Sequence, residues 1–220
     1  MSRRIYLMRH GDVAYFPDPP RPVTSKDAEL TPTGVEQARA TGRALAGVEF
    51  DRVVTSALTR TVQTAEAVVG ELAVPPAGAF EPIPDLDEIR GGPTMIPDEE
   101  LEALFLTEFG GTPPRDASFH GGETVGSLVD RVSAAMERLY ADDDWHNMLV
   151  IAHGGPNRAI LSEILAGPGA FIGNLEQSPG CINIIDGGPE LIVRALNVTP
   201  YDPGISVSTL EQHRDLQQGT

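Results

Sequence analysis

Short apolar runs alternate with longer segments of helical periodicity along this 220-residue chain. The apolar runs, which predict strands, cover residues 4–8, 50–56, 148–152, 181–186 and 190–197. Apolar positions at helical spacing predict helices over residues 32–46, 57–72, 122–143 and 156–167. This alternation predicts an α/β three-layer sandwich with a mostly parallel central sheet and helices on both faces.

Turn and capping residues support several of these boundaries. Thr31 followed by Pro32 is typical of a helix start, with a capping side chain and a proline in the first turn. Gly187 and Gly188 separate the last two apolar runs and predict a hairpin. Residues 73–84 carry four prolines and are expected to include one short extended piece.

The domain organisation follows from the segments that lack a period. Residues 90–121 are rich in glycine and proline, and only 97–109 could form a helix there. Such a segment within a regular alternation predicts a small insertion, or lid, over the active site. The chain turns polar after Pro200, so we expect one domain over residues 1–202 and a polar tail over 203–220.

Composition excludes several classes of function. The formal net charge of −16 argues against nucleic-acid binding, which needs a basic surface. No apolar run approaches the length of a membrane span, and the apolar stretch after Arg3 and Arg4 is too short for a signal peptide. Cys181 is the only cysteine, which precludes an intrachain disulfide. These features predict a cytoplasmic protein that contacts no membrane; they leave the oligomeric state open.

Two predicted strands end in the same dipeptide. The stretches RRIYLMRHGD (3–12) and NMLVIAHGGP (147–156) are apolar runs that each lead into His-Gly. In open parallel sheets the functional site lies beyond the carboxyl ends of the strands. We therefore expect His10 and His153 to face one crevice.

Charged residues are expected at the same edge. Arg9 precedes His10, Arg60 lies in the first predicted turn after the strand 50–56, and Glu88 follows in the loop that enters the insertion. Two guanidinium groups, two imidazoles and the positive ends of helices describe an anion site. Because the arginine fork matches phosphate oxygens, phosphate is the favoured anion.

This set of residues predicts a chemistry. A neutral His10 can attack phosphorus and hold the phosphoryl group, and Arg9 and Arg60 would disfavour its protonated form. The other ring nitrogen is expected to donate to a backbone carbonyl, and the following glycine to let the backbone approach the phosphate. Glu88 is the candidate acid that protonates the leaving group.

Other polar residues compete for these roles or have ordinary structural explanations. Asp12, Asp85 and Asp87 are alternative acids. His120 is expected in a loop, at most at the rim of the site. Glu123, in the stretch GGET, is explained equally well as a site residue or as part of a helix start.

At this point the chain resembles the histidine phosphatases, also called the phosphoglycerate-mutase-like superfamily. The resemblance covers almost the whole chain to about residue 200. It rests, in the family's order, on LMRHG (7–11), LTPTGVEQA (30–38), VVTSALTRTVQTAEAV (53–68), LDEI (86–89), GGET (121–124) and VIAHGG (150–155). It implies that His10 is the phosphorylated nucleophile, that Arg9, Arg60 and His153 form the phosphate pocket, and that Glu88 donates the proton. It also implies an enzyme that needs no metal or other cofactor.

The sequence departs from the family pattern at two places. Asp12 follows the first His-Gly where members often carry Glu or Gln, and Phe16 stands where an asparagine often helps to hold the phosphate. Glu88 is followed by IRGGPTM instead of the usual Gly-aromatic-acidic signature. These differences predict a pocket mouth that is less polar than that of the sugar-phosphate mutases.

We therefore expect a phosphomonoesterase that hydrolyses a small phosphorylated metabolite through phospho-His10. One alternative is a phosphoglycerate-type mutase, but such mutases usually carry paired arginines in a longer insertion, and here Arg90 and Arg115 are well separated. A second is a protein that binds a phosphorylated ligand without catalysis. A metal site built on the two histidines is disfavoured by the adjacent arginines.

Overall fold

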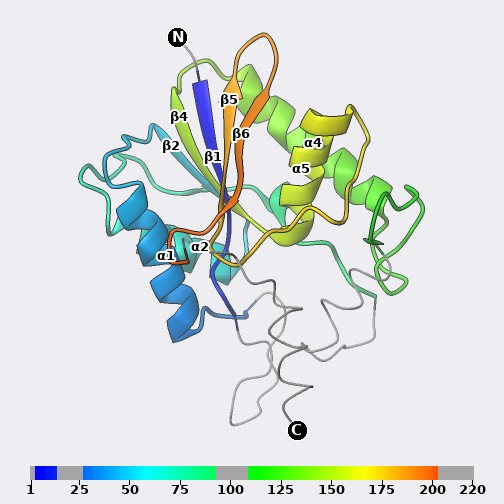
Figure 1. Cartoon of the computed structure of the whole chain (residues 1–220), viewed down its shortest axis with the longest axis horizontal. Coiled ribbons are helices and arrows are strands. Elements are labelled where there is room, and N and C mark those ends of the chain that lie inside the picture. Colours follow the sequence, from blue (N-terminus) through cyan, green and yellow to red (C-terminus); the bar gives the residue numbers. More distant parts are fainter. Residues whose placement is uncertain (1–2, 14–26, 93–108, 203–220) are drawn as a thin grey trace, which may run out of the picture.

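The computed structural model describes residues 3–13, 27–92 and 109–202. They form one six-stranded sheet in the order β3-β2-β4-β1-β5-β6 (Figure 1). The strands are β1 (Arg3–Arg9), β2 (Arg52–Thr55), β3 (Glu81–Pro82), β4 (Asn147–Ala152), β5 (Ile182–Gly187) and β6 (Ile192–Val198). All five expected strands are present, and β3 is the short extended piece that was expected near residues 73–84.

The sheet is parallel on one side of β1 and antiparallel on the other. β1 pairs in parallel with β4, β4 with β2, and β2 with β3. β5 runs antiparallel to β1, and β6 runs antiparallel to β5 as the expected hairpin. The mostly parallel sheet is thus confirmed. The carboxyl ends of β1, β2 and β4 meet at one edge.

Two pairs of helices cover the two faces of the sheet, as expected for a three-layer sandwich. α1 (Pro32–Ala44) and α2 (Thr59–Val69) lie on one face, and α4 (Val125–Ala141) and α5 (Gly154–Ala166) lie on the other (Figure 1). A 3-10 turn, η1 (Pro84–Leu86), follows β3. α5 begins two residues before Pro156, because β4 passes directly into the helix through His153 as its N-cap residue.

Alternating side chains of β1 enter two hydrophobic cores. Ile5 and Leu7 pack with α4 and α5, whereas Tyr6 and Met8 pack with α1 and α2. Burial on both faces is what a central parallel strand requires. The apolar stripe of α4 is buried as its periodicity predicted, through Val125, Leu128, Val129, Val132, Ala135, Met136 and Leu139.

The glycine after His10 has a packing role in the structure. Gly11 does not adopt a positive φ. A Cβ atom on it would overlap the carbonyl oxygen of Gly34 at the start of α1, and a Cβ on Gly34 would overlap that of Asp12. The sequence therefore needs glycine here because the backbone after His10 packs against the backbone of α1, which fixes the position of the histidine.

Several expectations fall outside the described residues. These are the helix over 97–109 apart from its last residue, the middle of the 90–121 insertion, the side chain of Phe16 and the tail over 203–220. Within the part of the chain that the structure describes, no helix has both the length and the apolar character needed to cross a membrane.

Candidate active site

The carboxyl edge of β1, β2 and β4 brings together the residues that the sequence placed there. His10 follows β1, Arg60 is the second residue of α2, and His153 joins β4 to α5. Their exposed fractions are 2%, 1% and 0%. The two imidazole rings lie 5.0 Å apart between centroids, at an angle of 63°. Both histidines therefore face a single site, as predicted.

Hydrogen bonds define which nitrogen of His10 is reactive. Its Nδ1 lies 2.7 Å from the carbonyl oxygen of Gly11, which can only accept, so Nδ1 carries the proton. The Nε atom of Arg60 donates to Nε2 of His10 over 3.2 Å. Nε2 thus holds a lone pair inside the site, and the expected bond from the ring to a backbone carbonyl is confirmed.

Both histidines are held in the neutral form. Burial, followed by the charges of Arg60 and Arg9, lowers the pKa of His10 well below its usual range. Burial and Arg60 likewise lead the causes that lower the pKa of His153. Sequence reasoning named the arginines; the structure shows that removal from water is the larger effect.

These low pKa values predict a dependence of stability on pH. On unfolding, each histidine recovers a pKa of about 6.5 and takes up a proton below it. Above about pH 6.5 both histidines are neutral in the folded and the unfolded protein, so their full contribution to the free energy of unfolding is present. It is lost as the pH falls toward the folded-state pKa values, by up to about 1.4 kcal/mol per pH unit for each histidine.

Urea unfolding of His10→Asn between about pH 7.5 and pH 5 measures this effect. Below about pH 6.5, we expect the free energy of unfolding of the variant to fall with a slope that is smaller than the wild-type slope by up to about 1.4 kcal/mol per pH unit. Replacement of the exposed His146 serves as the control. Equal slopes for His10→Asn and the wild-type protein would show that the buried ring takes up a proton without unfolding.

Ser56, after β2, sets the second histidine. Its Oγ lies 2.8 Å from Nε2 of His153. We assign the Ser56 proton to His153, because this contact is shorter than the 3.1 Å contact between the Ser56 and Thr61 hydroxyl groups. Nε2 of His153 then accepts, and its Nδ1 carries the proton.

Several buried polar atoms at this edge lack hydrogen-bond partners within the described ranges, and two of them lie beside His10. These two are Nδ1 of His153 and Nε of Arg9. Another nitrogen of Arg9, Nη1, donates to the carbonyl oxygen of Gln177. Buried donors are normally satisfied, so a pair of unsatisfied donors beside a neutral nucleophile is the arrangement that an oxyanion would complete.

Glu88 lies at the start of α5, beside these residues. Its Oε1 accepts hydrogen bonds from the backbone N–H groups of Gly155 (3.0 Å) and Ile89 (2.9 Å). A Cβ atom on Gly154 would lie 3.8 Å from Oε2 of Glu88 and 3.9 Å from Nε of Arg9. The carboxyl group and Arg9 therefore flank the same backbone position, with Oε2 as the oxygen that is free of these backbone bonds.

The alternative acids are engaged elsewhere. Asp12 accepts from the hydroxyl of Thr31 at 2.7 Å, and Asp87 accepts from the backbone N–H of Ala57 at 3.1 Å. Asp85 pairs with Arg138 on α4 at 2.5 Å. Of the four carboxyl groups considered from the sequence, Glu88 is thus the one that the structure places beside both Arg9 and α5.

Sequence reasoning missed the residues that support this group. One of these residues is Ser56, within the stretch VVTSALTRTVQTAEAV (53–68). Gln177 orients Arg9 through its carbonyl, and its own side chain is fixed by Asn157 (3.1 Å) and Asn183 (2.8 Å). Gln177 lies in a loop without periodicity, so no signal in the sequence marks it.

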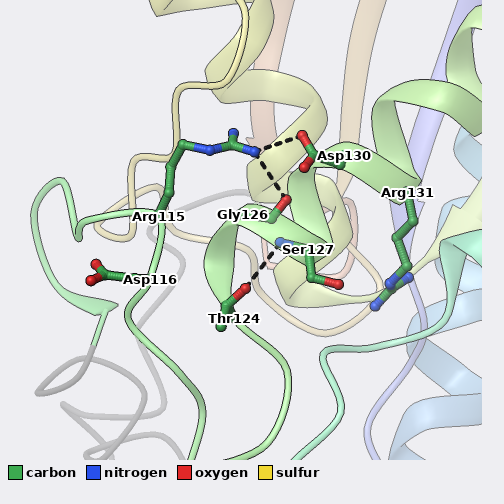
Figure 2. A pocket seen from close by; sticks show the side chains of 7 residues that line it. All are labelled: Arg115, Asp116, Thr124, Gly126, Ser127, Asp130 and Arg131. Atoms are coloured by element: carbon green, nitrogen blue, oxygen red, sulfur yellow. Dashed lines mark hydrogen bonds and ion pairs between the residues drawn. The ribbon is translucent and has the colours of Figure 1, made fainter.

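A hollow lies beside the first turn of α4. Figure 2 shows the residues that line it, which are Arg115, Asp116, Thr124, Gly126, Ser127, Asp130 and Arg131. Arg115 is paired there with Asp130 at 2.6 Å. Among the described residues, no group of three or more His, Cys, Asp or Glu side chains is placed to hold a metal ion.

Comparison with known proteins agrees with this geometry. Residues 5–197 match the histidine phosphatase superfamily (branch 1), and the chain belongs to that family. Among its relatives is the adenosylcobalamin/alpha-ribazole phosphatase of Salmonella typhimurium, 27% identical over 83% of this chain and 90% of that protein. A 2,3-bisphosphoglycerate-dependent phosphoglycerate mutase of Beijerinckia indica is 30% identical over 73% of this chain and 80% of that protein.

The fold is shared with solved structures of the same kind. The alpha-ribazole phosphatase of Shigella flexneri superimposes with a TM-score of 0.66, at 24% identity, over 94% of this chain and all of that one. The relatives of this chain therefore include both phosphatases and a mutase that transfers phosphoryl groups.

Proposed function

We propose that this protein is a phosphomonoesterase that works through a phosphohistidine at Nε2 of His10. The observation that carries the proposal is the environment of that atom. It is a neutral, buried nitrogen whose ring is oriented by the Gly11 carbonyl, and it lies among Arg60, Arg9 and His153. Neither surface ion pairing nor core packing explains unsatisfied donors beside a lone pair.

In the first step, Nε2 of His10 attacks phosphorus and the bond between phosphorus and the ester oxygen breaks. Arg9, Arg60 and Nδ1–H of His153 stabilise the phosphoryl oxygens, and Glu88 gives its proton from Oε2 to the leaving alcohol. In the second step, Glu88 takes a proton from water, whose oxygen attacks phosphorus. The phosphorus–nitrogen bond breaks, phosphate leaves, and Glu88 is again protonated. The two guanidinium groups supply the positive charge, so the proposed mechanism uses no metal or other cofactor.

A small phosphorylated metabolite is the proposed substrate. The relatives support this class, because their names give alpha-ribazole phosphates and phosphoglycerates as substrates. Hydrolysis is favoured over mutase chemistry by Arg115, which is paired with Asp130 beside α4 instead of being directed at the site. Incubation with 3-phosphoglycerate distinguishes the two activities, since a phosphatase releases phosphate without forming the isomer.

Glu88→Gln tests the acid. The amide keeps an oxygen for Gly155 but cannot supply the leaving-group proton. We expect kcat/KM, which reports the first step alone, to fall by about 10²- to 10⁴-fold for an alkyl phosphate, and by less than about tenfold for p-nitrophenyl phosphate, whose leaving group needs no proton. Asp87→Asn is the matched control on the same loop and should leave both rates within about twofold. Equal losses on the two substrates would remove Glu88 from the acid role.

A further inference from the structure

A buried ion pair at α4 holds the loop that carries Glu88. Nε of Arg131 donates to Oε1 of Glu123 over 2.7 Å, and Nη2 donates to Oε2 over 2.9 Å. The side chains are 12% and 5% exposed, respectively. Two parallel bonds of this kind fix both the distance and the plane of the guanidinium group.

The rest of the hydrogen-bonding capacity of this pair is directed at the backbone around Glu88. Arg131 donates from Nη1 to the carbonyl oxygen of Asp85 (2.7 Å) and from Nη2 to that of Glu88 itself (3.2 Å). Glu123 accepts from the N–H of Arg90 through Oε2 (3.0 Å), and its own N–H donates to the Arg90 carbonyl (2.7 Å). The loop is thus bound on both sides of the proposed acid.

Arg131 has a different environment from the other arginine near the start of α4. In Figure 2, Arg115 lies on the outer side of the helix and pairs with Asp130, whereas Arg131 is directed away from Arg115. Arg131 donates to two backbone carbonyls of the loop and pairs with Glu123, which lies just before α4.

Stability alone does not account for this pair. Apolar contacts already anchor the loop, because Leu86 and Ile89 are buried in the core shared with α4. A buried ion pair is costly to desolvate, and apolar residues of similar size often serve stability as well. The pair also orients the loop, because Arg131 fixes the backbone carbonyl of Glu88. The carboxyl group of Glu88 must meet the leaving oxygen.

We propose that Arg131, held by Glu123, is a positioning residue for the carboxyl group of Glu88 in leaving-group protonation. The inference rests on the proposed role of Glu88 and adds a requirement to it. Gly155 fixes one oxygen of the carboxyl group, and Arg131 fixes the backbone from which the side chain extends. Neither Arg131 nor Glu123 contacts the phosphoryl group in this assignment.

The charge on Glu123 is maintained in this environment. Burial by itself would raise the pKa of its carboxyl group, but hydrogen bonds from Arg131 and from the backbone N–H of Arg90 outweigh burial and lower it. The ion pair of Arg131 and Glu123, which we call the clamp, is therefore intact at the pH values at which a neutral His10 acts as nucleophile.

Arg131→Gln tests the proposal, with Arg138→Gln as the matched control. Arg138 lies on the same helix and also reaches the loop, but it pairs with the exposed side chain of Asp85. A displacement of about 1 Å in a catalytic group can cost about 10²-fold in rate. We expect Arg131→Gln to lower kcat/KM for an alkyl phosphate by about 10- to 10²-fold, with kcat/KM for p-nitrophenyl phosphate nearly unchanged. Arg138→Gln should match the wild-type protein on both substrates.

The double variant with Glu88→Gln separates positioning from general damage. If Arg131 acts through Glu88, Arg131→Gln causes no further loss on the alkyl phosphate once Glu88 has been replaced. An additive loss, or equal losses on the two leaving groups, would make the pair merely structural. Should Arg131→Gln fold poorly, Glu123→Gln gives a milder form of the same test and should show the same dependence on the leaving group.

The outcomes distinguish the two proposals. If Glu88→Gln discriminates between leaving groups but both clamp variants behave like the wild-type protein, the positioning role is wrong and the proposed function stands. If Glu88→Gln itself fails to discriminate, Glu88 is not the acid and the positioning role falls with it.

Discussion

His10→Ala is expected to lower kcat for every phosphomonoester by on the order of 10⁴- to 10⁶-fold, the range found when a covalent nucleophile is removed. The hydrogen bonds of the ring orient the lone pair of the buried Nε2 toward Arg60. Without this nitrogen, no phosphoramidate forms. Water would have to attack the ester directly, without a covalent intermediate.

Rapid quenching with a radiolabelled substrate provides the measurement. The wild-type protein should yield a phosphoprotein that is labile in acid and stable in base, and His10→Ala should yield none. The exposed His146 gives a matched control, because His146→Ala should retain both the label and the turnover. Full turnover by His10→Ala would rule out the mechanism through phospho-His10.

Arg60→Met should produce the next largest loss, about 10³- to 10⁵-fold in kcat, by analogy with arginines that stabilise other phosphoryl transfers. Arg60 is fully buried, donates to Nε2 of His10 and carries one of the two charges of the pocket. Methionine fills a similar volume but provides neither charge nor donor. Arg52→Met, at an ion pair on β2, is the control and should retain wild-type activity.

The pH profile of the same variant gives an independent readout. Because the charge of Arg60 helps to lower the pKa of His10, its removal should raise that pKa. Protonation of His10 would then inactivate the variant at a higher pH, so the acidic limb of kcat/KM should move upward. Binding of inorganic phosphate, followed by calorimetry, should weaken in parallel. An unchanged limb together with unchanged phosphate binding would place Arg60 outside the site.

The sequence was sufficient to predict the positions of the two histidines and two arginines, because the order and direction of the strands determine where these residues lie. Strands that run parallel end at the same edge, so a residue just after β1 and one just after β4 must be neighbours. Arg60 is predictable for the same reason, since a helix that directly follows β2 begins at that edge.

Contacts made by irregular segments were not predictable in this way. Glu88 was a candidate acid from its place in the sequence and by resemblance, but its bond to the Gly155 N–H depends on how a loop without periodicity folds back onto α5. Arg131 lies on α4 beside the apolar stripe, where charged residues usually face solvent. Its side chain is only 12% exposed because it forms an ion pair with Glu123, which lies next to it in the fold. The stretch GGET proves to combine two roles, since Thr124 caps α4 while Glu123 supports the loop.

The central place of β1 has a consequence for how the protein is made. This strand leads into the proposed nucleophile and precedes its sheet neighbours, β4 and β5, which begin only at residues 147 and 182. Contacts so distant in sequence slow folding and delay it until late in synthesis. β1 therefore has no partner strand until β4 and β5 have been synthesised, and the proposed activity can begin only after residues 3–187 have emerged.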